Sequence, residues 1–173
     1  INGFHVKPEH AMNAIANAKP GPVAEGNVGG GTGMICHEFK CGTGTSSRIV
    51  DVLSKAYTVG VLVQANYGVR ETLRVAGVPV GLEITHDQAY DTPQAPSGDT
   101  GSIIIVVATN APLLPHQLKR LARRAALGLA RNGSYAGNGS GDIFIAFSTA
   151  NDPASRSDAL ALLEMVPNDE IDP

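Results

Sequence analysis

The sequence predicts an α+β fold, in which layered sheets of apolar strands are covered by helices. Three apolar runs are typical of buried strands, at residues 58–68, 102–110 and 141–150. An amphipathic helix is predicted over residues 113–133, between the second and third of these strands. Apolar strands of this kind need cover from other elements, which is the arrangement of layered domains.

The length and composition fit one domain with a substantial core. The chain has 173 residues, of which 43% are hydrophobic and 17% are charged. We therefore expect a single domain over residues 1–173, without an internal repeat. The chain begins with Ile1 rather than Met, and we expect it to be the C-terminal part of a longer precursor.

The first half contains fewer clear elements. A helix is predicted over residues 8–18, because Pro occupies its first position. Residues 35–50 alternate poorly between apolar and polar and predict no element. Residues 75–84 predict another short strand or a pair of strands, and residues 85–101 a long polar loop rich in Pro and Gly.

The second half has a more regular pattern. Gly133 is placed to end the long helix after the strand at 102–110. A last helix is predicted over residues 155–166, with Ser155 or Ser157 as its N-terminal cap. Strand, helix, strand and helix then alternate through this half, in agreement with the layered fold.

Charge and hydropathy exclude two classes of partner. The net charge is −3 and the isoelectric point is about 5.9, and this balance does not predict the strongly basic surface typical of nucleic-acid binding. The longest apolar runs are far shorter than the ~20 residues of a membrane span. We therefore expect neither a nucleic acid nor a membrane as a partner.

The two cysteines, Cys36 and Cys41, allow three interpretations. Their odd spacing would send the side chains to opposite faces of a continuous strand, so a disulfide would require a turn between them. A zinc site would need more ligands and a different spacing. Of these, the sequence favours two unlinked thiols, and no metal site is predicted.

The Gly101-Ser102 step lies between the polar loop and an apolar strand. An ordinary junction between a loop and a strand has this composition, but so does a peptide bond that the protein cuts itself. Attack of the Ser102 hydroxyl on the Gly101 carbonyl would produce an ester that water hydrolyses. The new α-amine of Ser102, with an ordinary pKa near ~8, would then be a base for the hydroxyl of the same residue. Gly101 is also able to adopt a strained conformation that other residues avoid.

Three further polar residues lie at the ends of predicted strands. Asn66 follows an apolar run, where its amide would cap backbone groups or donate to an oxyanion. Ser140 and Asp142 precede another apolar run, where they are either turn formers or a hydroxyl and carboxylate on one side of the backbone. No histidine has a partner at a spacing typical of a Ser-His-Asp triad.

Long motifs then relate the chain to a known family. "GGGTGMICHEFK", "GTSSR", "VLVQANYG", "SGDTGSIIIVVATNAPLLPHQLKRLARRAALGLAR" and "GNGSGDIFIAFST" occur in this order. Together they resemble the β-peptidyl aminopeptidase family, which includes the L-aminopeptidase/D-esterase enzymes. The resemblance covers most of the chain.

The resemblance implies a fold, a mechanism and residue roles. The fold would be a four-layer αββα sandwich similar to that of N-terminal nucleophile hydrolases, here incomplete because an upstream segment is missing. Self-cleavage between Gly101 and Ser102 would give segments 1–101 and 102–173, with Ser102 as the nucleophile. Asn66 would stabilise the oxyanion, and Ser140 and Asp142 would orient the amine and hydroxyl of the nucleophile.

Two features depart from the family pattern. Family members often have Gly-Gly where this chain has Cys41-Gly42, which puts a side chain into a tight part of the backbone. The chain also begins where the family's sequence is already well advanced. The missing part would contribute strands and residues of the substrate pocket.

We therefore predict an aminopeptidase that releases N-terminal residues from short peptides, amides or esters through an acyl-enzyme on Ser102. The resemblance implies no cofactor, no metal and a homo-oligomer of cleaved subunits. One alternative is an acyltransferase of the ornithine acetyltransferase type, whose nucleophile is a threonine. The other is an uncleaved, inactive remnant that only binds peptides.

Overall fold

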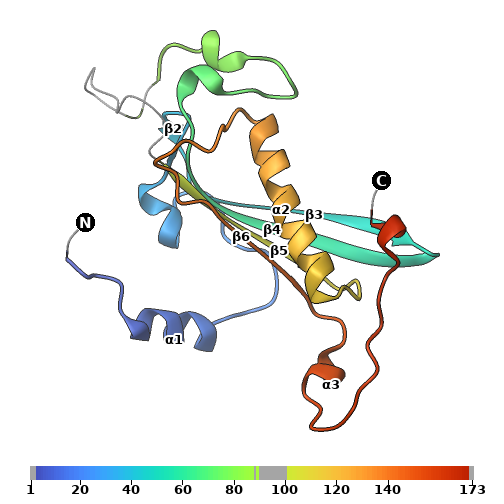
Figure 1. Cartoon of the computed structure of the whole chain (residues 1–173). Helices are drawn as coiled ribbons and strands as arrows, with labels where there is room; N and C mark the ends of the chain where they lie inside the picture. The colour runs from blue at the N-terminus through green and yellow to red at the C-terminus, as the bar shows by residue number, and fades with distance from the viewer. Residues whose placement is uncertain (1–2, 88, 90–100, 172–173) are drawn as a thin grey trace.

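A four-stranded sheet forms the centre of the computed structural model, which describes residues 3–87, 89 and 101–171 (Figure 1). The strands follow the order β3-β4-β5-β6. β3 pairs with β4 and β4 with β5 in antiparallel fashion, whereas β5 and β6 are parallel. The bounds of these strands are Thr43–Val52, Lys55–Asn66, Ser102–Thr109 and Ile143–Ser148.

The remaining elements are shorter, apart from one long helix. A small hairpin of β1 and β2 precedes the sheet, and α1, α2 and α3 are the α-helices of the described chain. Four 3-10 turns complete the secondary structure. The bounds are Ile35–Cys36 (β1), Phe39–Lys40 (β2), Pro8–Ala16 (α1), Pro115–Arg131 (α2), Asp152–Ser155 (α3), Gly29–Gly33 (η1), Arg70–Thr72 (η2), Val80–Leu82 (η3) and Asn168–Glu170 (η4).

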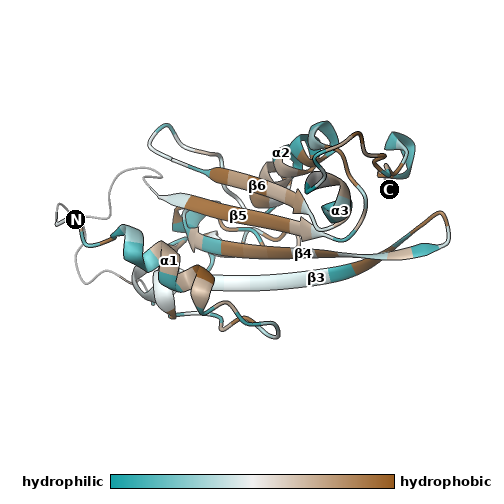
Figure 2. Ribbon diagram, turned by 90° about the horizontal axis from the view of Figure 1, so that it is seen from below, coloured by the Kyte–Doolittle hydropathy of each residue, from teal (hydrophilic) through white to brown (hydrophobic). Residues whose placement is uncertain are grey.

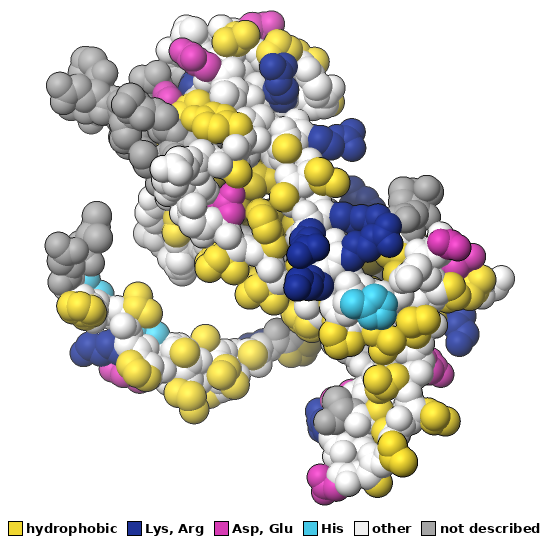
Figure 3. All heavy atoms as spheres, in the orientation of Figure 1, with side chains coloured by type: hydrophobic (Ala, Val, Ile, Leu, Met, Phe, Trp, Pro, Cys, Tyr) yellow, Lys and Arg dark blue, Asp and Glu magenta, His cyan; other side chains and the backbone are white. Residues whose placement is uncertain are grey.

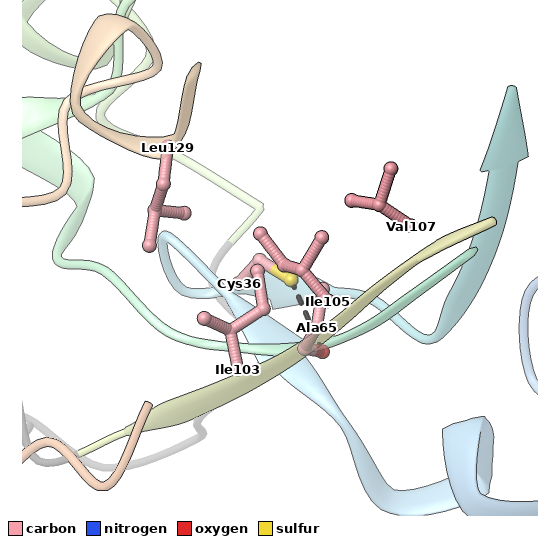
Figure 4. Close-up of a cluster of buried hydrophobic side chains, with 6 residues drawn as sticks. All are labelled: Cys36, Ala65, Ile103, Ile105, Val107 and Leu129. Carbon is pink, nitrogen blue, oxygen red and sulfur yellow. Dashed lines mark hydrogen bonds between the residues drawn. The ribbon is translucent and has the colours of Figure 1, made fainter. Parts of the chain in front are cut away.

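Helix α2 covers one face of the sheet and forms the main core with it (Figure 1). Pro115 occupies the first turn, where its missing N–H has no partner to lose, and Gly133 follows the last turn with a φ of 101°. Leu129 of α2 packs with apolar side chains from β1, β4 and β5 (Figure 4). The buried members of this cluster are Cys36, Ala65, Ile103, Ile105, Val107 and Leu129.

The outer side of α2 is basic. Lys119, Arg120 and Arg123 are exposed there, and Figure 3 shows Lys and Arg side chains gathered over this helix. The helix is therefore amphipathic as the sequence predicts, with an apolar side on the sheet and a charged side in water.

Apolar residues on the opposite face of the sheet are exposed to solvent. Figure 2 shows hydrophobic colouring along β4, β5 and β6. Ile104, Ile143, Ile145 and Phe147 are 41%, 50%, 47% and 45% exposed. Within the described residues no second large sheet covers this face, so these residues provide one sheet and one helical layer. These are two neighbouring layers of the four that an αββα sandwich has.

Two predictions of secondary structure are wrong. Residues 75–84 form only an isolated bridge between Val75 and Val78, followed by η3. The helix expected over residues 155–166 is absent. The short helix α3 ends at Ser155, and residues 156–167 have no regular secondary structure. The other elements agree, although β4 begins earlier than expected and β3 falls in a stretch for which none was predicted.

Side chains elsewhere bind the backbone that this last helix would have used. The Asn151 amide exchanges two hydrogen bonds with the backbone of Glu164, each of 2.9 Å. Val166 donates its N–H to the carbonyl of Pro112 and is buried with Val52 and Leu113. The segment is therefore fixed at Glu164 and Val166 by partners outside it instead of coiling. Among the described helices, none is long and apolar enough to cross a bilayer.

Candidate active site

Ser102 and Asn66 are neighbours across the β4–β5 pair. Asn66 is the last residue of β4 and Ser102 the first of β5, and the two are paired in the antiparallel register. Paired residues place their side chains on the same face of a sheet, with Cβ atoms about 4.5–5.5 Å apart. Both side chains are half-buried. The register thus brings together two of the predicted site residues.

Gly101 fits closely against the end of β4. A Cβ atom on this residue would lie 2.1 Å from the Asn66 carbonyl oxygen and 2.8 Å from the Tyr67 Cα. Gly101 is not among the glycines with a positive φ. The glycine is therefore required for space, and the left-handed conformation that would indicate backbone strain at this bond is absent.

The loop before β6 brings the other two predicted residues to the same end of the sheet. The Gly141 N–H donates to Ser102 Oγ over 2.9 Å. Asp142 Oδ1 accepts the N–H of Ile103 over 3.2 Å, and it also accepts the Ser140 hydroxyl. Because β6 runs parallel to β5, the start of β6 lies beside the start of β5. All four predicted side chains consequently meet at one edge.

The Ser102 hydroxyl accepts a hydrogen bond but donates none to the described residues. Its oxygen accepts the Gly141 N–H, whereas among the described residues no group accepts a hydrogen bond from this hydroxyl. No described histidine is hydrogen-bonded to it either. A base that takes the Ser102 proton therefore has to come from elsewhere, and the α-amine that cleavage would release is bonded to the same residue.

The amide of Asn66 has a fixed orientation. Its Oδ1 accepts the backbone N–H of Ile35 over 3.0 Å. Since only the oxygen of a carboxamide accepts from an N–H, Nδ2 must point away from Ile35. The two sequence interpretations of Asn66 are thus compatible, because the oxygen caps a backbone group and the nitrogen keeps its donor capacity.

Cys36 and Cys41 form a disulfide, so the prediction of two unlinked thiols is wrong. The chain reverses between them at His37 and Glu38, which have φ angles of 47° and 64° and form the turn of the β1–β2 hairpin. This turn brings the two Cα atoms to 5.3 Å, a separation that suits a disulfide. The alternation argument assumed a continuous strand and failed for that reason.

Arg70 holds the same hairpin and was not predicted. The side chain is only 3% exposed, and its guanidinium lies 3.4 Å from the centre of the Phe39 ring. Its side-chain hydrogen bonds to the described residues all go to backbone carbonyls, over 2.7 to 3.3 Å. A single Arg in "YGVRETL" carries no signal of this role, since its acceptors come from two distant segments. They are His37, Glu38, Ile84, His86 and Asp87.

The structural relatives have this fold. The chain superimposes on the L-aminopeptidase D-Ala-esterase/amidase of Ochrobactrum anthropi with a TM-score of 0.84 and 52% identity, over 99% of this chain and 46% of that one. That enzyme is described as a variant of the Ntn hydrolase fold. A β-aminopeptidase of a Burkholderia species gives a TM-score of 0.80 and 52% identity, over 98% and 47% of the two chains. The structure therefore has an α+β fold of the N-terminal nucleophile hydrolase class.

Sequence relatives give the family. The model of peptidase family S58 matches residues 1–173, and the chain belongs to this family. The β-peptidyl aminopeptidase BapA of Sphingosinicella microcystinivorans is 57% identical over 99% of this chain and 46% of its own length. The BapA of Sphingosinicella xenopeptidilytica is 53% identical over 87% of this chain and 39% of its own length. The chain thus spans less than half the length of these two relatives.

Proposed function

We propose that this protein is a self-processing aminopeptidase whose nucleophile is Ser102. The observation that carries the proposal is the meeting of Ser102, Asn66 and Asp142 at one sheet edge, where none of the described residues accepts the hydroxyl proton of Ser102. The names of the relatives support the same class of reaction.

The first step of the proposed mechanism is self-cleavage. Ser102 Oγ attacks the Gly101 carbonyl carbon, a C–O bond forms, and the C–N bond of the peptide breaks. The hydroxyl proton ends on the departing nitrogen of Ser102. Water then hydrolyses the ester, which leaves a carboxylate on Gly101 and a free α-amine on Ser102. The N–H of Gly141, 2.9 Å from Ser102 Oγ, helps to fix the attacking oxygen.

The second step is turnover of substrate. The α-amine of Ser102 takes the hydroxyl proton as Oγ attacks the substrate carbonyl, and Asn66 Nδ2 donates to the oxyanion. The proton passes to the leaving amine, and water later releases the acyl group from Oγ. The Asp142 carboxylate already binds the N–H of Ile103, one residue from the new amine. It thus lies close enough to orient this amine and to balance its positive charge.

The substrates follow from the relatives' names and the chemistry together. The relatives are called β-peptidyl aminopeptidases and an L-aminopeptidase with D-Ala-esterase and amidase activity. We infer that short peptides, amides or esters with a free N-terminal amine are the substrates. The mechanism uses no cofactor or metal. A homo-oligomer of cleaved subunits stays a prediction from the family.

Intact mass under denaturing conditions tests the proposal, with the complete gene product compared to its Ser102→Ala variant. We expect two fragments separated between Gly101 and Ser102 in the parent and one uncut species in the variant. Hydrolysis of a β-alanyl or L-alanyl anilide should appear only in the parent. An uncut parent without hydrolysis would support the peptide-binding remnant. Transfer of the acyl group to an added amine in preference to water would support the acyltransferase.

A further inference from the structure

The orientation of Asn66 depends on a very short element. The Ile35 N–H that binds Asn66 Oδ1 belongs to β1, which has two residues, and its partner β2 is equally short. A two-stranded hairpin of this size is not stable by itself in water. Whatever holds this hairpin in place therefore also holds the amide of Asn66.

The two ends of the hairpin are held by different means. Arg70 binds the turn, through the carbonyls of His37 and Glu38. At the open end, where Ile35 pairs with Lys40, the disulfide joins Cys36 to Cys41.

The hydrogen bonds at the open end come from an exposed side chain and from the backbone. The Lys40 ammonium binds the carbonyls of Gly31, Met34 and Cys41. The Cys41 N–H also binds the Met34 carbonyl. The disulfide is the covalent link there, and it lies next to Ile35 in sequence.

The bridge is packed against the end of β4. Cys36 is 9% exposed and belongs to the core cluster with Ala65 and Ile103, the residues beside Asn66 and Ser102 (Figure 4). Its Sγ lies 3.3 Å from the Ala65 carbonyl oxygen. Movement of the bridge would therefore be transmitted to the strand ends that carry the nucleophile and the oxyanion donor.

We propose that the Cys36–Cys41 disulfide is a positioning element for Asn66, and that its reduction lowers catalysis without lowering substrate affinity. This inference rests on the proposed function of Ser102 and Asn66. A dithiol reduces the bridge by exchange: its thiolate attacks one sulfur, and its second thiol displaces the resulting mixed disulfide. The dithiol becomes a disulfide, and Cys36 and Cys41 become two thiols.

The first test compares the oxidised protein with protein reduced by dithiothreitol, using the complete gene product. Serine-reactive active-site titration normalises kcat to the number of competent Ser102 nucleophiles. We expect reduction to lower this kcat about three- to tenfold, a part of the 10²–10³ that loss of an oxyanion donor costs. KM should stay unchanged, because the oxyanion exists only in the transition state. The double variant Cys36→Ser/Cys41→Ser should show the same loss and no response to dithiothreitol.

The Asn66→Ala background separates positioning from a general effect. There, reduction should not lower kcat any further, because the group that the bridge positions is gone. An equal loss with and without Asn66 would overturn the inference, as would an unchanged kcat in parent protein whose thiol count shows full reduction.

Hydrogen exchange gives a readout that does not require turnover. Reduction should speed exchange of the Ile35 amide at least tenfold, and the amides of β5 should keep their protection. If Ile35 keeps its protection, the disulfide does not position this hairpin and the inference fails. A protein that is neither cut nor active would instead overturn the proposed function, and Ile35 exchange would still decide the role of the bridge.

Discussion

The two ends of the central sheet use the same side-chain types in different ways. The site end is where β5 begins at Ser102, and the far end is where β5 ends at Thr109. At the far end, Thr109 donates its hydroxyl to the Thr58 carbonyl and accepts the N–H of Ala111. Ser148 likewise donates to the Ala111 carbonyl over 2.6 Å and accepts the N–H of Ala150. At the site end, the Ser102 hydroxyl accepts the N–H of Gly141 and donates to no group of the described residues. The hydroxyl protons of Thr109 and Ser148 thus have acceptors within the protein, whereas the proton of Ser102 has none among the described residues.

The asparagines make a second comparison between the two ends. Asn66 Oδ1 accepts the N–H of Ile35, and Asn110 Oδ1 accepts the N–H of Thr58 over 2.7 Å. Capping by the oxygen is therefore common to both. What differs is the neighbour, since Asn66 is paired with Ser102 across the strands. Location beside the Ser102 hydroxyl, and not the amide itself, distinguishes a candidate oxyanion donor.

The largest expected effect comes from Asn66→Ala. We predict that kcat for anilide hydrolysis falls by roughly 10²–10³, since the oxyanion loses its side-chain donor. KM should change little, and steady-state kinetics on titrated enzyme measures both constants.

Asn110→Ala is the matched control at the far end. It removes the acceptor of the Thr58 N–H and should cost about 0.5–1.5 kcal/mol of stability with kcat unchanged. Full activity in Asn66→Ala, or an equal loss of kcat in both variants, would show that the two ends do not differ as argued.

The next largest effect is expected from replacing Arg70 and Gln117, the buried polar side chains near the site end and the far end of the sheet. Arg70 is buried beside the β1–β2 hairpin, and its side-chain donors bind backbone carbonyls such as those of His37 and His86. Arg70→Lys supplies three donors instead of five, in a different geometry. We expect a loss of about 2–4 kcal/mol in the free energy of unfolding, because carbonyls stay buried and unpaired. Urea denaturation measures this loss, and kcat should fall as well, because the hairpin carries Ile35.

Gln117 is the corresponding residue at the far end. It is 2% exposed, donates to the Val166 carbonyl over 2.7 Å, and accepts the N–H of Leu114 over 2.9 Å. Gln117→Ala should destabilise the fold by about 2–3 kcal/mol without changing kcat per titrated Ser102. If both variants lower kcat alike, Arg70 acts through stability alone.

Those parts of the fold that depend on apolar runs could be predicted from the sequence. β4, β5 and β6 are apolar strands, and α2 has a clear helical period, so local pattern and tertiary packing agree. β3 was missed because it is an edge strand whose side chains are mostly exposed and polar. The helix expected over residues 155–166 failed because Asn151 and Pro112 bind its backbone groups from outside.

In the candidate site, too, the residues at strand ends could be predicted from the sequence, whereas contacts between distant segments could not. Ser102, Asn66, Ser140 and Asp142 lie at the ends of recognisable strands, so motif and position indicate that they lie close together, and their catalytic roles stay predictions. The disulfide and the acceptors of Arg70 depend on a tight turn and on segments far apart in the chain. Neither the disulfide nor these acceptors can be predicted from the periodic pattern of apolar and polar residues, because both depend on how the chain folds back on itself.

The smallest effect is expected for Ser148→Ala, which tests the comparison at its weakest point. Ser148 and Ser102 are both strand-end serines, but the hydroxyl of Ser148 bridges the Ala111 carbonyl and the Ala150 N–H. Its removal should cost about 1 kcal/mol in urea denaturation and leave both self-cleavage and kcat unchanged. Loss of self-cleavage in Ser148→Ala would mean that the far end of the sheet takes part in the reaction. A measurable stability loss with normal cleavage would place chemistry at one end and support at the other.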